Sequence, residues 1–481
     1  MAYRYGQRDQ GMLLPERIED YVGPADPVRA YDAFVDALNW KALGLPWNPH
    51  QVGNAEYDPR AMLKLLVYGY SYGIRSSRKL ERAVHHNLSF MWLMGGLKPD
   101  HKTIAEFRRK HKKALKGVLK QCARVCLDLG LIDGNVLFVD GTKVRANASR
   151  SRTQSRAQCE EQLKKLDKRI ETLLAACEAA DAEEEGQPSS VSMDEGLSKT
   201  QRLKARVEEL LSKMDDRSEE KINATDEDSA IMHSAQGSHS SYNVQQVVDD
   251  QNGLIVQAEA VRDTSDVNQF ARQMTQAQQA LGRKCEVACG DAGYADTEEL
   301  EKVDGQGVRV IVPSQRQALR KGPKRFDKNE FRYDETADCY WCPKGEPLHL
   351  QWTDSVRAKR YYRPSSPARC RACEHFGLCT RSKLGRTIMR LEREALKKRL
   401  EADYESEASQ AIYARRKGRA ELPFGHWKRN LKLDAFLLRG LEGVSAETAL
   451  VATCFNMVRM INLLGGVQAL RQRLAGLTAP A

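Results

Sequence analysis

The sequence predicts a mixed α/β protein whose sheet-containing core is interrupted by two insertions and preceded by an all-helical segment. Three observations support this fold class. Strand and helix patterns alternate between residues 135 and 312. Two stretches with heptad spacing follow the first strand, and a stretch rich in cysteine, arginine and aromatic residues follows the last. The core is therefore expected to be assembled from separated parts of the chain.

The chain has 481 residues, a length that corresponds to about two to four domains. The predicted segments are a helical domain at 1–130, the first part of the core at 131–150, a helical hairpin at 151–225, the second part of the core at 226–324, a Cys-rich insertion at 325–385 and a C-terminal helical part of the core at 386–470.

Composition excludes several classes of protein. With 41% hydrophobic and 29% charged residues, the chain can bury a core and is not disordered throughout. No run approaches the roughly 18 apolar residues of a membrane span, and the start lacks the apolar region of a signal peptide. Twelve cysteines in such a chain are expected to be reduced thiols or metal ligands in the cytoplasm. The net charge of +11 favours polyanionic partners.

The N-terminal part carries helix start signals. Asp58 and Pro59 open an apolar-periodic helix, residues 77–86 form another, and Thr103 with Glu106 makes a capping box for a third. The third helix is expected to carry a basic face that includes Arg108, Arg109, Lys112 and Lys113. Such a face is either a solvated surface or one that docks on DNA, which would make 1–130 a DNA-binding domain.

The core elements follow from short apolar runs and turn signals. Strands are predicted at 135–140, 242–248, 254–261, 285–290 and 308–312, with helices at about 265–281 and from 297. Residues 249–253 are predicted to form the turn of a hairpin. Leucine-rich heptads at 163–177 and 203–214 predict a helical hairpin that is structural or dimer-forming, and 449–464 forms a closing apolar helix.

Two carboxylates, Asp140 and Asp291, stand at the predicted ends of apolar strands and before small residues. Adjacent carboxylates at the rim of a sheet repel each other unless a cation lies between them. Oxygen ligands without a nearby histidine favour Mg²⁺ or Mn²⁺ over zinc. The alternative is that each aspartate only forms a turn.

A third acid, Glu421, lies in a strongly basic stretch at 415–429. If a helix begins near Pro423, Lys428 falls within two turns of Glu421 on a similar face, which suits one metal ligand beside one phosphate ligand. The alternative is a glutamate that only neutralises a basic helix.

Five cysteines lie in the stretch 325–385. Cys339 and Cys342 form one Cys-x-x-Cys pair, Cys370 and Cys373 form a second, and Cys379 is a spare. Four of these five thiols suit a tetrahedral structural zinc ion, although His375 can replace one of them. The alternatives are unliganded thiols or a redox role. Other cysteines are expected in the core: Cys122, Cys126, Cys285, Cys289 and Cys454.

Several runs, taken in order, resemble bacterial insertion-sequence DDE transposases with an RNase H-like core. The three acidic runs are Val139-Asp140-Gly141-Thr142-Lys143, Gly290-Asp291-Ala292-Gly293-Tyr294 and Glu421-Leu422-Pro423-Phe424-Gly425-His426-Trp427-Lys428. Runs between 57 and 108 resemble the InsH-like helical domain of the insertion-sequence eleven-eighty-two group: Tyr57-Asp58-Pro59-Arg60, Tyr68-Gly69-Tyr70, Gly73-Ile74-Arg75-Ser76-Ser77-Arg78 and Lys98-Pro99-Asp100-His101-Lys102-Thr103-Ile104-Ala105-Glu106-Phe107-Arg108. The resemblance covers residues 10–465.

This resemblance implies a catalytic, metal-binding triad of Asp140, Asp291 and Glu421. Two Mg²⁺ or Mn²⁺ ions about 3.5–4 Å apart would serve first hydrolysis and then attack by the freed 3′-hydroxyl. Lys428 and Arg429 would hold DNA phosphates.

The wider family pattern around the third acid is tyrosine, two residues, arginine, three residues, glutamate, six residues, lysine. Lys428 fits this pattern, Lys417 takes the place of the arginine, and Tyr413 is one place early. Proline stands two residues after Glu421 instead of directly after it. The roles of Tyr413, Arg416 and Lys417 therefore stay open.

The resemblance further implies double-stranded DNA partners, namely the terminal inverted repeats of the element and the target DNA. Cutting two ends together implies a homodimer or a higher oligomer in the bacterial cytoplasm, on the nucleoid. Two rival interpretations remain open: a metal-dependent nuclease of the same fold that does not join ends, and an inactive DNA-binding protein or decayed copy.

Overall fold

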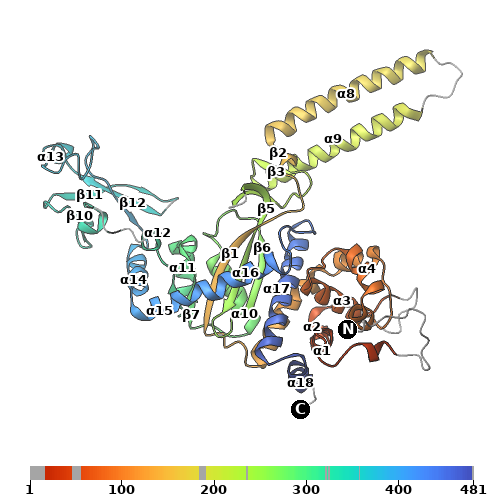
Figure 1. The fold of residues 1–481 in the computed structure, drawn as a ribbon. Helices are drawn as coiled ribbons and strands as arrows, with labels where there is room; N and C mark the ends of the chain where they lie inside the picture. Colours follow the sequence, from red (N-terminus) through yellow and green to blue (C-terminus); the bar gives the residue numbers. More distant parts are fainter. Residues whose placement is uncertain are drawn as a thin grey trace, which may run out of the picture. The chain divides into compact units, whose positions relative to one another are not determined.

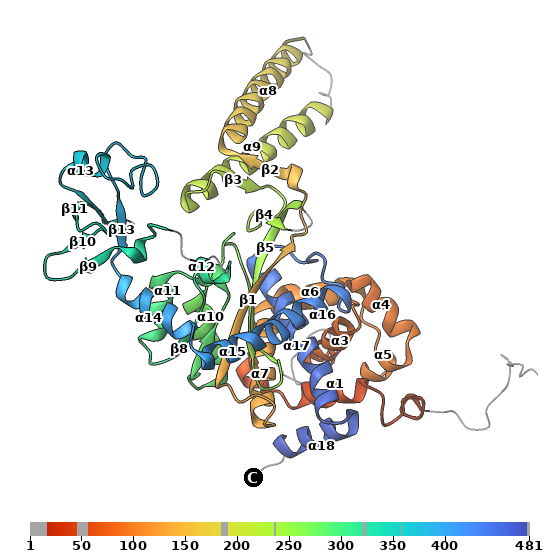
Figure 2. The same ribbon diagram turned by 60° about the vertical axis from the view of Figure 1, so that its left-hand side comes forward.

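The computed structural model describes residues 17–45, 56–183, 191–234, 237–319, 322, 325–356 and 358–478. The chain forms two compact units, shown as ribbons in Figures 1 and 2. The first consists of Met1–Asp266, Thr275–Lys284 and Lys417–Ala481, and the second of Val267–Met274 and Cys285–Arg416. Predictions for residues 1–16 and for the tip of the helical hairpin at 184–190 lie outside the described residues.

The N-terminal part of the first unit is helical, as predicted. Its elements are η1 (Ile18–Tyr21), α1 (Val28–Asp36), α2 (Trp40–Leu43), α3 (Pro59–Ser71), α4 (Ser77–His86), α5 (Leu88–Leu93), α6 (His101–Lys110) and α7 (Lys112–Asp128). Asp58 caps α3 by accepting a hydrogen bond of 2.8 Å from the Arg60 backbone, which confirms the predicted start.

The predicted capping box at Thr103 is wrong. Helix α6 begins three residues earlier, because the Asp100 carboxylate accepts a 2.7 Å hydrogen bond from the Thr103 backbone, and Asp100 therefore takes the N-cap position predicted for Thr103. The basic stretch is also divided between two helices, since α6 ends at Lys110 and α7 starts at Lys112. The expected basic residues therefore do not share one continuous helical face.

An antiparallel sheet forms the centre of the first unit. Its strands are β1 (Val136–Arg145), β4 (Ala230–Ser234), β5 (Gly237–Asp249) and β6 (Ile255–Val261). β5 is the middle strand: it pairs with β1 along one edge and with β6 and then β4 along the other. The predicted hairpin turn at 249–253 joins β5 to β6, with Gly253 at φ +65°.

Asp140 does not end its strand, contrary to the prediction. β1 continues to Arg145, because the long partner β5 supplies pairing residues beyond Asp140, from Gln245 opposite Gly141 to Ser241 opposite Arg145. The Asp140 carboxylate therefore belongs to the middle of a paired strand, where hydrogen bonds to β5 fix the backbone on one side.

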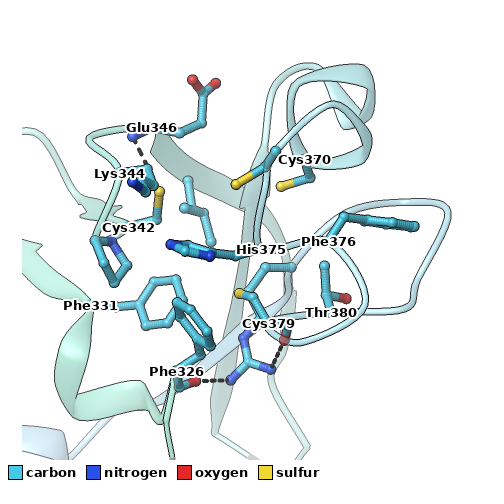
Figure 3. A pocket seen from close by; sticks show the side chains of 14 residues that line it. Phe326, Phe331, Cys342, Lys344, Glu346, Cys370, His375, Phe376, Cys379 and Thr380 are labelled. Carbon is cyan, nitrogen blue, oxygen red and sulfur yellow. Dashed lines mark hydrogen bonds between the residues drawn. The ribbon is translucent and has the colours of Figure 1, made fainter.

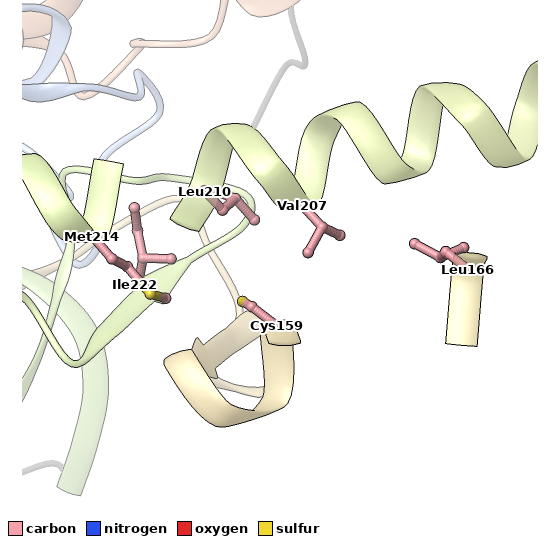
Figure 4. Close-up of a cluster of buried hydrophobic side chains, with 6 residues drawn as sticks. All are labelled: Cys159, Leu166, Val207, Leu210, Met214 and Ile222. Carbon is pink, nitrogen blue, oxygen red and sulfur yellow. The ribbon is translucent and has the colours of Figure 1, made fainter. Parts of the chain in front are cut away.

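The inserted hairpin consists of α8 (Arg156–Glu183) and α9 (Val191–Arg217), which run side by side (Figure 1). Its base is closed by η2 (Arg150–Arg152) and by the strand pair β2 (Thr153–Ser155) and β3 (Lys221–Asn223). Figure 4 shows the apolar cluster at this base, formed by Cys159, Leu166, Val207, Leu210, Met214 and Ile222. Leu203, predicted on the seam, is instead 45% exposed.

The C-terminal part of the first unit is helical: η5 (Lys417–Glu421), α16 (Leu422–Arg429), α17 (Leu441–Leu463) and α18 (Val467–Thr478). α17 packs on α3, α7 and β6, so that the N-terminal helices and the sheet share one core. Among the described residues, α17 is the one helix whose length and hydropathy would also suit a membrane span. Most of it is buried, which is the position of a core helix.

The second unit contains a short parallel pair of strands with helices. β7 (Val287–Cys289) and β8 (Arg309–Ile311) pair in parallel. The accompanying elements are η3 (Ala292–Tyr294), α11 (Thr297–Asp304), α12 (Gln315–Ala318), α14 (Glu394–Tyr404) and α15 (Glu407–Arg416). Helix α10 (Phe270–Leu281) contributes its start to this unit and its end to the first, and stops before Gly282 at φ +72°, as predicted.

The Cys-rich stretch of the second unit folds as a five-stranded antiparallel sheet, which the sequence did not predict. Its strands, in spatial order, are β13 (Ile388–Leu391), β12 (Lys359–Pro364), β11 (Pro347–Asp354), β10 (Cys339–Trp341) and β9 (Arg332–Asp334). Two short helices accompany it, η4 (Lys328–Glu330) and α13 (Pro367–Arg371). The sheet covers a small core of aromatic and aliphatic side chains: Phe331, Tyr340, Leu348, Tyr362 and Ile388.

Candidate functional site

One face of β1 brings the first predicted acid close to the segment of the third. Asp140 is directly opposite Gln246 on β5, so the two side chains share a face of the sheet. Gln246 is fully buried, and its Nε2 donates a 2.5 Å hydrogen bond to the backbone oxygen of Ala420, the residue before Glu421. Asp140 is 8% exposed, whereas Glu421 is exposed. A single glutamine therefore links the strand of one acid to the segment of the other.

A second contact joins the same two elements. Lys428 Nζ donates a 3.0 Å hydrogen bond to Thr142 Oγ1. Because side chains two residues apart on a strand point to the same face, Thr142 shares the face of Asp140. Lys428 and the exposed Arg429 form the last turn of α16, where positive charge is favourable. The predicted phosphate ligand thus lies beside the strand of the predicted metal ligand.

The segment that ends at Glu421 is π-helical, from Lys417 to Glu421. Tyr413 and Arg416 on α15 already have the family spacing of tyrosine, two residues, arginine, and the departure noted above is one additional residue between Arg416 and Glu421. A π-turn accommodates one more residue than an α-turn, and such turns recur at functional sites. The additional residue and the irregular turn therefore coincide in the chain.

Asp291 lies in the second unit, two residues after β7. Its Oδ1 accepts a 2.8 Å hydrogen bond from the Gly293 backbone and so caps η3. Tyr413 of the same unit interacts with it electrostatically. Burial raises the pKa of the Tyr413 hydroxyl, and the negative charge of Asp291 contributes to this rise in pKa. The turn-forming role foreseen as the alternative is therefore present, and it leaves the second carboxylate oxygen available for another ligand.

Within the described ranges, no group of three or more His, Cys, Asp or Glu side chains is arranged to hold a metal ion. One buried oxygen is nevertheless notable. Gln246 Oε1 finds no hydrogen-bond partner in the described part of the chain, although it lies beside Asp140. A buried acceptor without a donor is costly, and a cation or its bound water would satisfy it.

The four predicted DNA-binding residues of the N-terminal helices differ in exposure. Arg108 is buried and donates hydrogen bonds to Tyr70 Oη, to the Arg75 backbone oxygen and to Ser77 Oγ. Its guanidinium is therefore a structural cross-link, and the prediction that Arg108 contacts DNA is not compatible with this position. Arg109 is exposed and pairs with Glu106 at 2.5 Å, Lys113 is exposed, and Lys112 is half-buried.

Four of the five cysteines in the Cys-rich stretch line one small pocket (Figure 3): Cys342, Cys370, Cys373 and Cys379. Burial raises the pKa of the Cys379 thiol, and the other three thiols raise this pKa further, while the Arg386 guanidinium lowers it. Cys339 does not line the pocket. It is buried in β10, where burial and the nearby Asp334 carboxylate raise its pKa.

The cysteines expected in the core are buried, as predicted: Cys122, Cys126, Cys285, Cys289 and Cys454. Sequence reasoning did not single out Gln246 or Thr142. No local signal marks either residue, because their roles follow from the register of β1 against β5 and from the position of α16.

Two family models match the chain. A family described as a transposase domain of the DUF772 type matches residues 16–110, and a family described as a transposase DDE domain matches residues 341–461. The second match contains Glu421 and Lys428, whereas Asp140 and Asp291 lie outside both matches. Together they define a DNA transposase.

The two matches support an insertion-sequence DDE transposase, an enzyme that cuts DNA and transfers its strands. None of the curated proteins matches the chain. A solved structure of a piggyBac transposase synaptic complex with hairpin DNA is 9% identical, and the alignment covers 94% of this chain and 79% of that chain with a TM-score of 0.35. A TM-score this low does not establish a shared fold.

Proposed function

We propose that this transposase cleaves DNA at the terminal inverted repeats of its own element and joins the freed 3′-hydroxyl ends to target DNA, using Asp140, Asp291 and Glu421 on an RNase H-like core. The proposal includes membership of the insertion-sequence eleven-eighty-two group. The observation that carries the proposal is the joining of two elements by two contacts: Gln246 to Ala420 at 2.5 Å and Lys428 to Thr142 at 3.0 Å. These contacts hold the segment of Glu421 against the face of β1 that carries Asp140.

The donor set fits hard divalent cations. Carboxylate oxygens, with the unsatisfied Gln246 Oε1 beside Asp140, suit Mg²⁺ or Mn²⁺ and do not suit zinc. When bound, two such ions would activate the attacking oxygen and stabilise the leaving oxygen of a phosphodiester. The chain itself would hold the carboxylates on fixed backbone: Asp140 by strand pairing, Asp291 by its capping bond to Gly293, and Glu421 at the end of the π-turn.

The π-turn supports an assignment for two further residues. With the additional residue absorbed between Arg416 and Glu421, Tyr413 and Arg416 correspond to the tyrosine and arginine of the family pattern. Lys417 would then not be the replacement for the arginine. The negative charge of Asp291 contributes to the raised pKa of the Tyr413 hydroxyl, which supports a role for Tyr413 near this proposed catalytic acid.

The proposed partners are the element ends and target DNA, held by a homodimer or higher oligomer on the bacterial nucleoid in the cytoplasm. Lys428 and Arg429 would hold phosphates at the active site, and Arg109, Lys112 and Lys113 would contact DNA from the helical domain at 1–130. Arg108 is excluded from this set because it is buried. The Cys-rich stretch would hold a structural zinc ion, separate from the catalytic cations.

The decisive experiment uses DNA that carries both flanks of the gene, with Mg²⁺ or Mn²⁺ and the full-length protein. Asp140→Asn and Glu421→Gln should each lower strand cleavage by at least about 10²–10³-fold, while end binding in a gel-shift assay stays unchanged. Glu160→Gln, on the exposed surface of α8, is the matched control and should cleave normally. Full cleavage by Asp140→Asn would overturn the proposed site.

A pre-cleaved end with a free 3′-hydroxyl separates joining from hydrolysis. Incubated with circular plasmid and the wild-type protein, it should become covalently joined to the plasmid. Nicking without joining would indicate a nuclease, and binding without nicking would indicate an inactive copy.

A further inference from the structure

We propose that the structural zinc ion of this transposase is held by the four thiols that share one pocket, and that the fifth cysteine of the stretch takes no part: Cys342, Cys370, Cys373 and Cys379 are the ligands and Cys339 is not. The inference rests on the proposed zinc but not on the catalytic role of the acids. It assigns a ligand set that the Cys-x-x-Cys spacing alone does not give, since that spacing pairs Cys339 with Cys342.

The first argument is placement. The four thiols come from two separate segments, one at 342 and one at 370–379, and both segments line the same small pocket (Figure 3). Cys339 lies in β10 directly opposite His349 and Asp334 on the neighbouring strands, and its side chain is 1% exposed. Because Cys339 is held in the paired strand and is not part of the pocket lining, it cannot join the four without disrupting the sheet.

The second argument is the turn that presents Cys342. Gly345, at φ +77°, donates a 2.8 Å hydrogen bond to the Cys342 backbone oxygen, and the Glu346 backbone N–H donates a 3.3 Å hydrogen bond to Cys342 Sγ. A backbone N–H that points at a sulfur stabilises the thiolate form that zinc requires. A glycine is needed here, because other residues rarely adopt this left-handed conformation.

The third argument is that two ion pairs join the two cysteine-bearing segments. Lys344 pairs with Glu374, and Arg369 pairs with Glu346 at 3.0 Å. Each pair joins the turn of Cys342 to the segment of Cys370 and Cys373. Gly385 also packs tightly there: a Cβ at this position would lie 3.3 Å from Cys370 Sγ and 2.8 Å from Pro364 Cγ.

Within the described residues the four thiols line one pocket but are not arranged to hold a metal ion, so zinc binding would require their side chains to reorient. Four thiolates in one small pocket would repel each other, and a single tetrahedral zinc ion removes that repulsion. His375 also lines the pocket, but its ring packs on Phe326 with centroids 4.8 Å apart, and its Nε2 lies 3.6 Å from Glu374. The imidazole already has neighbours, which favours four sulfur ligands.

The test measures zinc per chain by mass spectrometry on full-length protein dialysed against EDTA and then reloaded with zinc. Wild type and Cys339→Ser should each hold one ion, and Cys→Ser at 342, 370, 373 or 379 should each lose most of it. The same measurement in Asp140→Asn should again give one ion, which separates this proposal from the catalytic one.

Cobalt substitution of the wild-type protein provides a second readout, which reports the type of ligand directly. The ligand-field spectrum of the cobalt-loaded wild type should be that of four sulfur ligands, and His375→Ala should leave it unchanged. Loss of zinc from Cys339→Ser with retention in Cys379→Ser would overturn the ligand set, as would a spectrum with a nitrogen ligand. A wild-type protein without zinc would overturn the site itself.

Discussion

Gln246 shows how much of the proposed site depends on a single uncharged side chain. It is fully buried, pairs with Asp140 across the strands and donates to the backbone beside Glu421. Deleting it would remove a side-chain hydrogen bond between β5 and the π-turn and leave the Ala420 oxygen without that donor. The loss of a buried hydrogen bond costs about 1–3 kcal/mol.

Gln246→Ala is therefore expected to lower strand cleavage by about tenfold or more, which corresponds to about 1.4 kcal/mol of lost positioning. The rate is measured on pre-bound DNA so that binding does not contribute. Gln257→Ala is the control, because Gln257 lies on β6 of the same sheet and bonds to Gln276 instead. Equal rates for the two variants would show that Gln246 does not position the acids.

The environment of Asp249 leads to a prediction about how the free energy of unfolding depends on pH. Burial raises its pKa to about 7, despite hydrogen bonds from the Gly134 and Gln251 backbones that lower the pKa. The folded state thus keeps a proton that the unfolded state has already lost. The stabilisation from this group is full below the unfolded pKa of 3.8 and is lost as the pH rises towards 7.

The free energy of unfolding of wild type, relative to Asp249→Asn, should accordingly fall by about 2–4 kcal/mol between pH 4.5 and pH 8. Urea unfolding at several pH values measures this difference, and titrating groups other than the neighbouring Asp133, whose charge also raises the pKa of Asp249, cancel because both proteins contain them. A difference that stays constant over this range would show that the pKa of Asp249 is not raised.

At the scale of elements, a buried ion pair fastens α17 to the N-terminal helices. Arg75, between α3 and α4, lies 2.5 Å from Glu447 of α17 and also donates to the backbone oxygens of Ala435 and Lys432. Glu447 in turn accepts bonds of 3.0 Å from the backbones of Leu437 and Leu438. One pair thus holds three separate stretches of the chain.

Glu447→Gln should therefore destabilise the protein by about 3–5 kcal/mol, because it leaves the buried Arg75 charge without its counter-charge. Glu106→Gln, which breaks the exposed pair with Arg109, should leave the free energy of unfolding almost unchanged, because solvent screens the two charges. Both values come from denaturant unfolding. Similar losses for the two variants would contradict the difference in burial on which the prediction depends.

For the whole molecule, the net charge of +11 and the exposed basic residues predict that DNA binding weakens as the salt concentration rises. Lys112→Gln combined with Lys113→Gln should reduce the slope of log affinity against log salt by about 1–2. The matched control is Lys164→Gln combined with Lys165→Gln on the exposed face of α8, outside the proposed DNA contacts. Equal changes of slope in the two double variants would mean that only net charge matters.

The sequence by itself determined the type and order of many elements. Local rules suffice for these: Asp58 and Pro59 start α3, Gly282 ends α10, and the turn before Gly253 joins β5 to β6. The ordered acidic runs and basic stretches indicated a transposase, which the two family matches show. Such signals are local because caps and turns depend on residues a few positions apart.

Tertiary structure decided what depends on partners distant in the chain. It extended β1 beyond Asp140 by pairing with β5, buried Arg108 beneath Ser77, and placed Gln246 and Lys428 where they join two elements. It also separated Cys339 from the other four thiols, although Cys339 and Cys342 are only three residues apart. Register, burial and pocket membership are set by side chains that meet across the fold, and no local spacing encodes them.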